Sequence, residues 1–188
     1  WGVPVRYHDI NHIVSDMAPP LVEVHLSYHD LDVKMDKYLK TNYSQQLVIH
    51  APELFSGDHT LDLCAEDENY RQKSISYLQH AIDKSEEIYN YFSMSAERQL
   101  IVNVGGFTEY CHLSVAEREA YYSRLKNSLQ QLDTRTIEIL PQTMPPFPWH
   151  FGGQRFHNIM MDEQEIITFC TEMDMRICLD VSHTKLAS

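Results

Sequence analysis

Short apolar runs of strand type alternate with helical patterns along the whole chain. The strand-type runs cover residues 3–7, 21–27, 46–50, 99–104, 136–140 and 177–179. The longest helical pattern covers residues 66–91, and a capping box at Ser114 and Glu117 opens another helix, expected over residues 115–132. This alternation predicts an α/β fold with a parallel sheet and right-handed crossovers. Six units suit an open doubly wound sheet or most of a (β/α)8 barrel, and the missing dinucleotide-binding glycine pattern favours the barrel.

Length and charge limit the class of protein. The chain has 188 residues and a formal net charge of −12 with neutral histidines. A negative chain without a Lys/Arg run argues against a nucleic-acid partner. The sequence contains no apolar stretch near the roughly 20 residues of a membrane helix, and no signal-peptide pattern, so no membrane partner is expected. The four cysteines are scattered and lack Cys-x-x-Cys spacing, which fits a reducing, cytoplasmic compartment.

Polar side chains recur at or near the ends of the strand-type runs. In residues 176–183, an apolar run is followed by Asp180 and His183. The side chains of these two residues can both reach one divalent cation or one substrate. The simpler alternative is that Asp180 caps the next turn and His183 lies at the surface. Carboxyl ends of parallel strands share one edge, so we expect the polar residues to converge there. They are Glu23, His25, His50, Glu53, Asn103, Glu138, Asp180 and His183.

Two loops also suggest binding. Residues 141–158 form a long connection rich in proline and aromatic residues, including Trp149 and His150. Such a composition favours a binding loop, with a satellite hydrophobic core as the alternative. Gly105 and Gly106 allow close backbone approach to a ligand or a sharp turn, and are weak evidence for phosphate binding.

Three motifs carry a resemblance to a known family. They are Ile137-Glu138, His50-Ala51-Pro52 and Leu-Asp-Val-Ser-His at residues 179–183. With these motifs, nearly the whole chain resembles the xylose-isomerase-like TIM barrels, a superfamily of sugar isomerases and epimerases that also contains endonuclease IV. The resemblance implies one barrel domain over residues 1–188, a partial barrel with about six β/α units whose C-terminal strands are missing.

The resemblance also implies roles for individual residues. Glu138 and Asp180 would bind a divalent metal (Mn, Mg or Zn), and Glu138 and His183 would be catalytic. One departure from the family pattern is Asn103, where many members have a histidine on the fourth strand. The expected substrate contacts are His25, His50, Trp149 and His150.

The expected function is that of a metal-dependent sugar or sugar phosphate isomerase or epimerase, acting by proton transfer through an enediolate. One alternative is an endonuclease IV-like zinc phosphodiesterase on abasic DNA, which the net charge disfavours. Another is a non-catalytic barrel that partners a synthase domain. Residues 2–9 and 141–154 resemble a barrel module of sialic-acid-synthase-like enzymes in bacterial surface-sugar pathways. That resemblance implies a fused or associated synthase-like domain.

Overall fold

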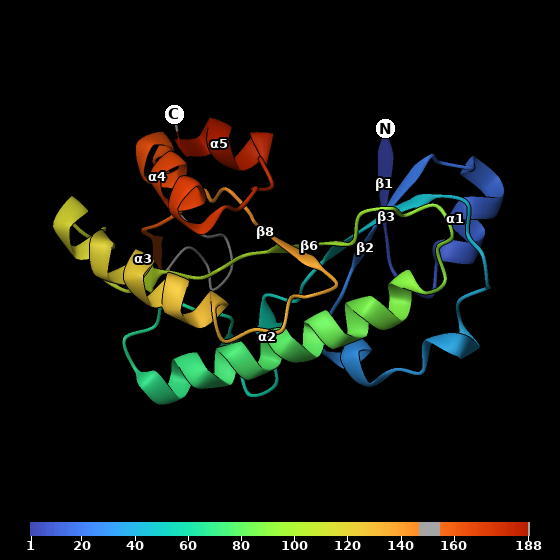
Figure 1. Ribbon diagram of the computed structural model, residues 1–188, viewed down its shortest axis with the longest axis horizontal. Helices are drawn as coiled ribbons and strands as arrows, with labels where there is room; N and C mark the ends of the chain where they lie inside the picture. Colours follow the sequence, from blue (N-terminus) through green and yellow to red (C-terminus); the bar gives the residue numbers. More distant parts are fainter. Residues whose placement is uncertain (147–154, 188) are drawn as a thin grey trace. The chain divides into compact units, whose positions relative to one another are not determined.

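The computed structural model describes residues 1–146 and 155–187 (Figure 1). A five-stranded sheet has the strand order β1-β2-β3-β6-β8, and β1, β2, β3 and β6 pair in parallel. This arrangement confirms the predicted α/β architecture with crossover connections. The strands are β1 (Gly2–Val5), β2 (Leu21–His25), β3 (Gln46–His50), β6 (Gln99–Val102) and β8 (Glu138–Pro141).

Five α-helices were found among the described residues: α1 (Ile10–Met17), α2 (Glu68–Tyr89), α3 (Val115–Leu129), α4 (Glu163–Met173) and α5 (Val181–Ala187). The predicted capping box is present, because Ser114 and Glu117 exchange both hydrogen bonds at the start of α3. The short 3-10 helices are η1 (Tyr28–Asp32) and η2 (Met35–Lys37). Two small sheets pair β4 (Leu54–Phe55) with β5 (His59–Thr60), and β7 (Phe107–Thr108) with β9 (Phe156–His157).

The last predicted strand is shorter than expected. Residues 177–179 do not form a strand, and only Cys178 makes a parallel bridge, to Gln142. Cys178 donates to the Pro141 carbonyl at 2.9 Å, and Thr143 donates to the Cys178 carbonyl at 3.0 Å. The ladder stops there because α5 begins at Val181, and the side chain of Leu179 is 61% exposed.

The chain divides into two compact units. The first, unit 1, comprises Trp1–His59, Leu78–Val102 and Asp133–Ile139, and the second, unit 2, comprises Thr60–Tyr77, Asn103–Leu132 and Leu140–Ser188. Each unit contains buried hydrophobic residues, and the expectation of one domain over residues 1–188 stays a prediction. The core of unit 1 includes Val22, Val24, Ile49, Ile82 and Ile88, and that of unit 2 includes Leu63, Val104, Leu125, Ile159 and Phe169.

The alternation of side chains along β2 separates the core of unit 1 from a polar face. Val22 and Val24 on β2 are at most 1% exposed, whereas Glu23 and His25 between and after them are half-buried. Successive strand residues point to opposite faces of a sheet, so the two acid–base residues share the face away from this core. The polar face predicted for residues 21–27 is therefore confirmed.

Candidate functional site

Two imidazoles and a carboxylate lie together at the ends of β2 and β3 in unit 1. His25 and His50 are register partners and the last residues of their strands. Their rings stack with centroids 4.9 Å apart and an interplanar angle of 12°. The His25 Nε2 atom lies 2.6 Å from Glu23 Oε1. A half-exposed imidazole in contact with a carboxylate can accept a proton from a ligand and return it.

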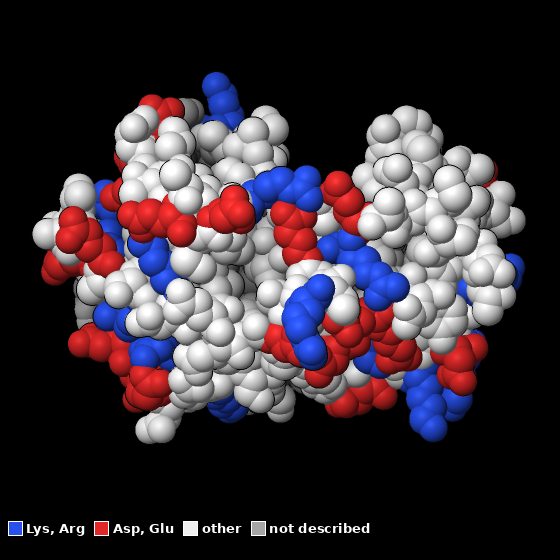
Figure 2. Space-filling model, viewed as in Figure 1, with Lys and Arg blue, Asp and Glu red and all other residues white. Residues whose placement is uncertain are grey.

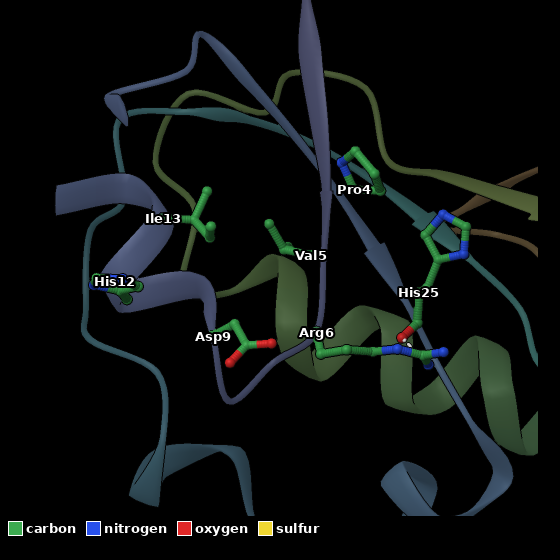
Figure 3. A pocket seen from close by; sticks show the side chains of 7 residues that line it. All are labelled: Pro4, Val5, Arg6, Asp9, His12, Ile13 and His25. Atoms are coloured by element: carbon green, nitrogen blue, oxygen red, sulfur yellow. Dashed lines mark hydrogen bonds between the residues drawn. The ribbon is translucent and has the colours of Figure 1, made fainter. Parts of the chain in front are cut away.

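A pocket of about 370 Å³ lies beside this cluster (Figure 3). Arg6 follows the end of β1, and its Nη1 donates to the His25 carbonyl oxygen at 2.8 Å. The volume is within the range of small-molecule sites. The pocket lies between β1 and α1 and reaches His25, the last residue of β2, and ligands of α/β folds bind near the carboxyl ends of the strands. The lining residues are Pro4, Val5, Arg6, Asp9, His12, Ile13 and His25.

A second polar cluster lies in unit 2, where residues after β8 meet the start of α5. Asp180 Oδ2 accepts from Gln142 Nε2, and Asp180 Oδ1 accepts from the His183 backbone N–H, both at 2.9 Å. The His183 Nδ1 atom lies 3.8 Å from Asp180 Oδ2. Asp180 therefore caps α5 and also lies beside His183. The alternative of a surface histidine is wrong, since His183 is 5% exposed.

The tautomer of His183 follows from its hydrogen bond. Its Nδ1 lies 2.8 Å from the Thr143 carbonyl oxygen, which can only accept. In the neutral ring Nδ1 therefore carries the proton, and Nε2 is the basic nitrogen. Gln142 and Thr143 were not predicted from the sequence. The sequence did contain a signal for these two residues, because they directly follow the proline that ends a strand-type run.

The position predicted for Glu138 is wrong. The sequence pattern placed it near the end of its strand, but β8 begins at Glu138 and ends at Pro141. Its Oε2 accepts a hydrogen bond of 3.2 Å from Nε2 of Gln99, which is itself the first residue of β6. The side chain therefore stands at the N-terminal end of its strand, opposite to the end where sites are built in barrels.

A buried carboxylate occupies the glycine turn after β6. Asp62 Oδ1 accepts from the backbone N–H groups of Gly106 and Cys64, both at 2.9 Å. Burial raises the pKa of the Asp62 carboxyl, and these two hydrogen bonds oppose that rise. The turn thus binds a carboxylate of the chain itself, which removes the case for phosphate there. The sequence pattern gave no signal for Asp62.

The predicted metal site is not complete in the described residues. No three His, Cys, Asp or Glu side chains within residues 1–146 and 155–187 are grouped so that they could hold a metal ion. Near Asp180, Gln142 Nε2 and the His183 backbone N–H donate to the two carboxylate oxygens. As they lie, these groups do not form the oxygen shell of a divalent metal. Trp149 and His150, the predicted loop contacts, lie outside the described residues.

The surface carries charges of both signs. On the face that Figure 2 shows, Lys and Arg side chains are interspersed with Asp and Glu. Such a mixture differs from the clustered cations that bind a nucleic-acid backbone. In the described part of the chain, no helix combines the length and apolar character needed to cross a membrane.

Comparison with known proteins places this geometry in a family. Residues 16–187 match the xylose isomerase-like TIM barrel family. The chain belongs to this family, and the barrel fold expected from the sequence is therefore confirmed. A search of curated proteins finds no match.

Solved structures of similar fold include two sugar epimerases and an epimerase-like protein. A D-tagatose 3-epimerase-like protein aligns over 96% of this chain and 65% of its own length, with 17% identity and a TM-score of 0.64. An L-ribulose 3-epimerase aligns over 98% and 62%, with 9% identity and a TM-score of 0.61. A D-allulose 3-epimerase from Methylomonas sp. aligns over 98% and 64%, with 11% identity and a TM-score of 0.61. The chain thus spans less than two thirds of each.

Proposed function

We propose that the protein acts on a sugar or sugar phosphate as an isomerase or epimerase, moving a proton at a carbon next to a carbonyl. The observation that carries this proposal is the stacked pair His25 and His50, with Glu23 at 2.6 Å from His25, beside a pocket of about 370 Å³. Two structural neighbours are named as 3-epimerases of L-ribulose and D-allulose, and a third as a D-tagatose 3-epimerase-like protein, which supports the choice of reaction.

In this proposal each residue of the cluster in unit 1 has a separate role. His25 exchanges the proton with the sugar, and Glu23 positions the ring and stabilises its charged form. His50, stacked on His25, has its Nδ1 atom 2.9 Å from the Ala51 carbonyl oxygen, so in the neutral ring its Nε2 accepts a hydrogen bond from a sugar hydroxyl. The Arg6 guanidinium, with one N–H held by the His25 carbonyl, has further donors for hydroxyl groups at the pocket wall.

The family resemblance adds His183 as a catalytic residue that orients a hydroxyl or the carbonyl oxygen of the sugar. Its basic nitrogen is Nε2, because Nδ1 donates to the Thr143 carbonyl. Gln142 and the His183 backbone N–H fix both oxygens of the neighbouring Asp180 carboxylate. Trp149 and His150 are proposed substrate contacts on the strength of the sequence alone.

Glu138 and a divalent metal enter the proposal through the family resemblance. The resemblance makes Glu138 a base and, with Asp180, a ligand of Mn, Mg or Zn, but the described groups, as they lie, do not form the oxygen shell of such an ion. Replacing Glu138 by Gln abolishes turnover if the resemblance holds at this position. Because Glu138 contacts Gln99 at the start of two strands, normal turnover in this variant, with an unchanged circular dichroism spectrum, would remove it from the mechanism. Metal analysis of the purified protein tests the ion directly.

The direct test of the reaction is a conversion assay. The full chain is incubated with D-tagatose, D-allulose and L-ribulose, with and without added Mn²⁺, and products are followed by NMR. The proposal predicts formation of an epimer or an isomer from at least one sugar, and retention of all three starting sugars would contradict it. A second candidate, favoured by the incomplete donor set, is a barrel that binds a sugar without converting it. Binding without product would support that candidate, whose proposed partner is a sialic-acid-synthase-like domain.

A further inference from the structure

Arg6 places a positive charge at the wall of the pocket in unit 1. It directly follows β1, and its Nη1 donates to the His25 backbone carbonyl, a neutral acceptor, at 2.8 Å. Among the residues that the structure describes, Arg6 makes no ion pair with an Asp or Glu side chain. A guanidinium stays protonated in proteins, so the pocket wall keeps a charge that no carboxylate of the described chain neutralises.

The hydrogen bond to His25 leaves most of the Arg6 guanidinium available to a ligand. The group has five N–H donors, and its bond to the His25 carbonyl uses one of them. A planar fork of donors matches two oxygens of a phosphate or a carboxylate, and the charge strengthens each hydrogen bond. A neutral hydroxyl gains less from that charge. The remaining donors therefore suit an oxyanion better than a hydroxyl group.

Asp9 is the carboxylate in the lining of the same pocket. Its Oδ2 atom lies 3.4 Å from His8 Nε2. Figure 3 shows Asp9 at the start of α1, whereas the Arg6 side chain extends toward the backbone of His25. An anion on Arg6 would therefore lie at the His25 end of the pocket, and Asp9 would weaken its binding from a distance.

We propose that the sugar bound in this pocket carries an oxyanion, a phosphate ester or a carboxylate, which Arg6 binds beside His25. This inference rests on the proposed function and narrows its substrate class from sugars in general to anionic sugars. The hydrogen bond between Arg6 and the His25 backbone fixes the anion site relative to the residue that exchanges the proton. Arg6 is thus a substrate-binding residue that discriminates between charged and neutral sugars.

The experiment is calorimetric titration of the full chain with four related sugars. D-tagatose is neutral, whereas D-tagatose 1-phosphate, D-tagatose 6-phosphate and D-tagaturonate carry an anion at one end of the same carbon skeleton. We expect at least one anionic sugar to bind at least about tenfold more tightly than D-tagatose. Tighter binding of a phosphate assigns the ester, and tighter binding of D-tagaturonate assigns the carboxylate.

Two variants of the pocket test the sign of the charge. Arg6→Gln removes the charge and keeps a donor for the His25 carbonyl. It is expected to weaken binding of the preferred anionic sugar about tenfold, and binding of D-tagatose by less. Asp9→Asn removes the negative charge of the lining, so it is expected to tighten binding of the anionic sugar about twofold.

Arg98→Gln is the matched control for the loss of one positive charge. Arg98 also belongs to unit 1, but it precedes the first residue of β6, at the opposite end of the parallel strands from Arg6. Its Nη2 donates to Asn90 Oδ1 at 3.1 Å, and its guanidinium lies over the Tyr89 ring. Arg98→Gln is therefore expected to bind the anionic sugar as the wild type does.

Two outcomes overturn the inference. The anionic sugars could bind no more tightly than D-tagatose, or Arg6→Gln and Arg98→Gln could weaken their binding equally. If D-tagatose nevertheless exchanges deuterium with solvent, the inference fails and the proposed function stands. If Arg6 binds the anion but the wild type exchanges deuterium into none of the four sugars, the proposed reaction fails and the anion site stands. The two failures are therefore distinguishable.

Discussion

The pKa of the Asp62 carboxyl differs from that of an ordinary aspartate because of its surroundings. Burial raises the pKa of its carboxyl above the usual 3.8, so the folded state holds the proton more tightly than the unfolded state. The stability that this group contributes is therefore full below pH 3.8 and is lost as pH rises through the raised folded-state pKa. The loss is at most about 1.4 kcal/mol per pH unit in that window.

Replacing Asp62 by Asn removes this titration and keeps an oxygen for Gly106 and Cys64. We expect the wild type to lose stability relative to Asp62→Asn as pH rises from about 4 through the raised pKa. Urea unfolding of both proteins between pH 4 and 7 measures the difference. Parallel stability curves over this range would show that Asp62 keeps an ordinary pKa.

Individual residues show which positions could be predicted from the sequence and which could not. Period-two alternation correctly put Glu23 and His25 on one face, because the side-chain period of a strand is fixed by its pleat. The same pattern misplaced Glu138, because alternation gives the face of a strand and not its first residue. Asp62 was missed because one of its partners is the backbone N–H of Gly106, 44 positions away, which no local pattern records.

The turn after β6 requires glycine at position 105. At Gly105, φ is 88° and an added Cβ would lie 2.5 Å from the Asp62 Cα, a backbone atom. We expect Gly105→Ala to destabilise the fold by more than about 3 kcal/mol, because backbone strain and a clash act together. Denaturant unfolding measures this loss.

Gly57→Ala is the matched control for the turn. Gly57 also has positive φ, 73°, but an added Cβ meets nothing within 4 Å. Only the conformational cost remains, about 1–2 kcal/mol. Equal losses in the two variants would contradict the close packing of Asp62 against the turn.

Other elements show which signals were local and which were not. The start of α3 was predictable because Ser114 and Glu117 satisfy each other three residues apart. The expected strand at residues 177–179 became a single bridge to Gln142, because its length depends on where α5 begins. Helix caps are encoded in a few adjacent residues, whereas strand length depends on a distant partner.

At the scale of the whole molecule, the resemblance of three motifs predicted the barrel family, and the alternation of strand-type and helical patterns predicted the parallel sheet. That inference succeeds because parallel neighbours require crossover connections, which impose the alternation on any such chain. Only part of the candidate site could be predicted in the same way. The convergence of His25 and His50 follows from strand order, while the Gln142–Asp180 hydrogen bond joins segments that sequence distance leaves unrelated.

The central claim is that His25, at the end of β2, moves a proton on a sugar. It is tested most directly by incubating the full chain with D-tagatose, D-allulose and L-ribulose in D₂O and following solvent deuterium incorporation by NMR. We expect the wild type to place deuterium on a carbon next to the carbonyl of at least one sugar. His25→Ala should do so at least about 100-fold more slowly, with an unchanged circular dichroism spectrum. Absence of deuterium with the wild type, or equal rates in the two proteins, would contradict the account.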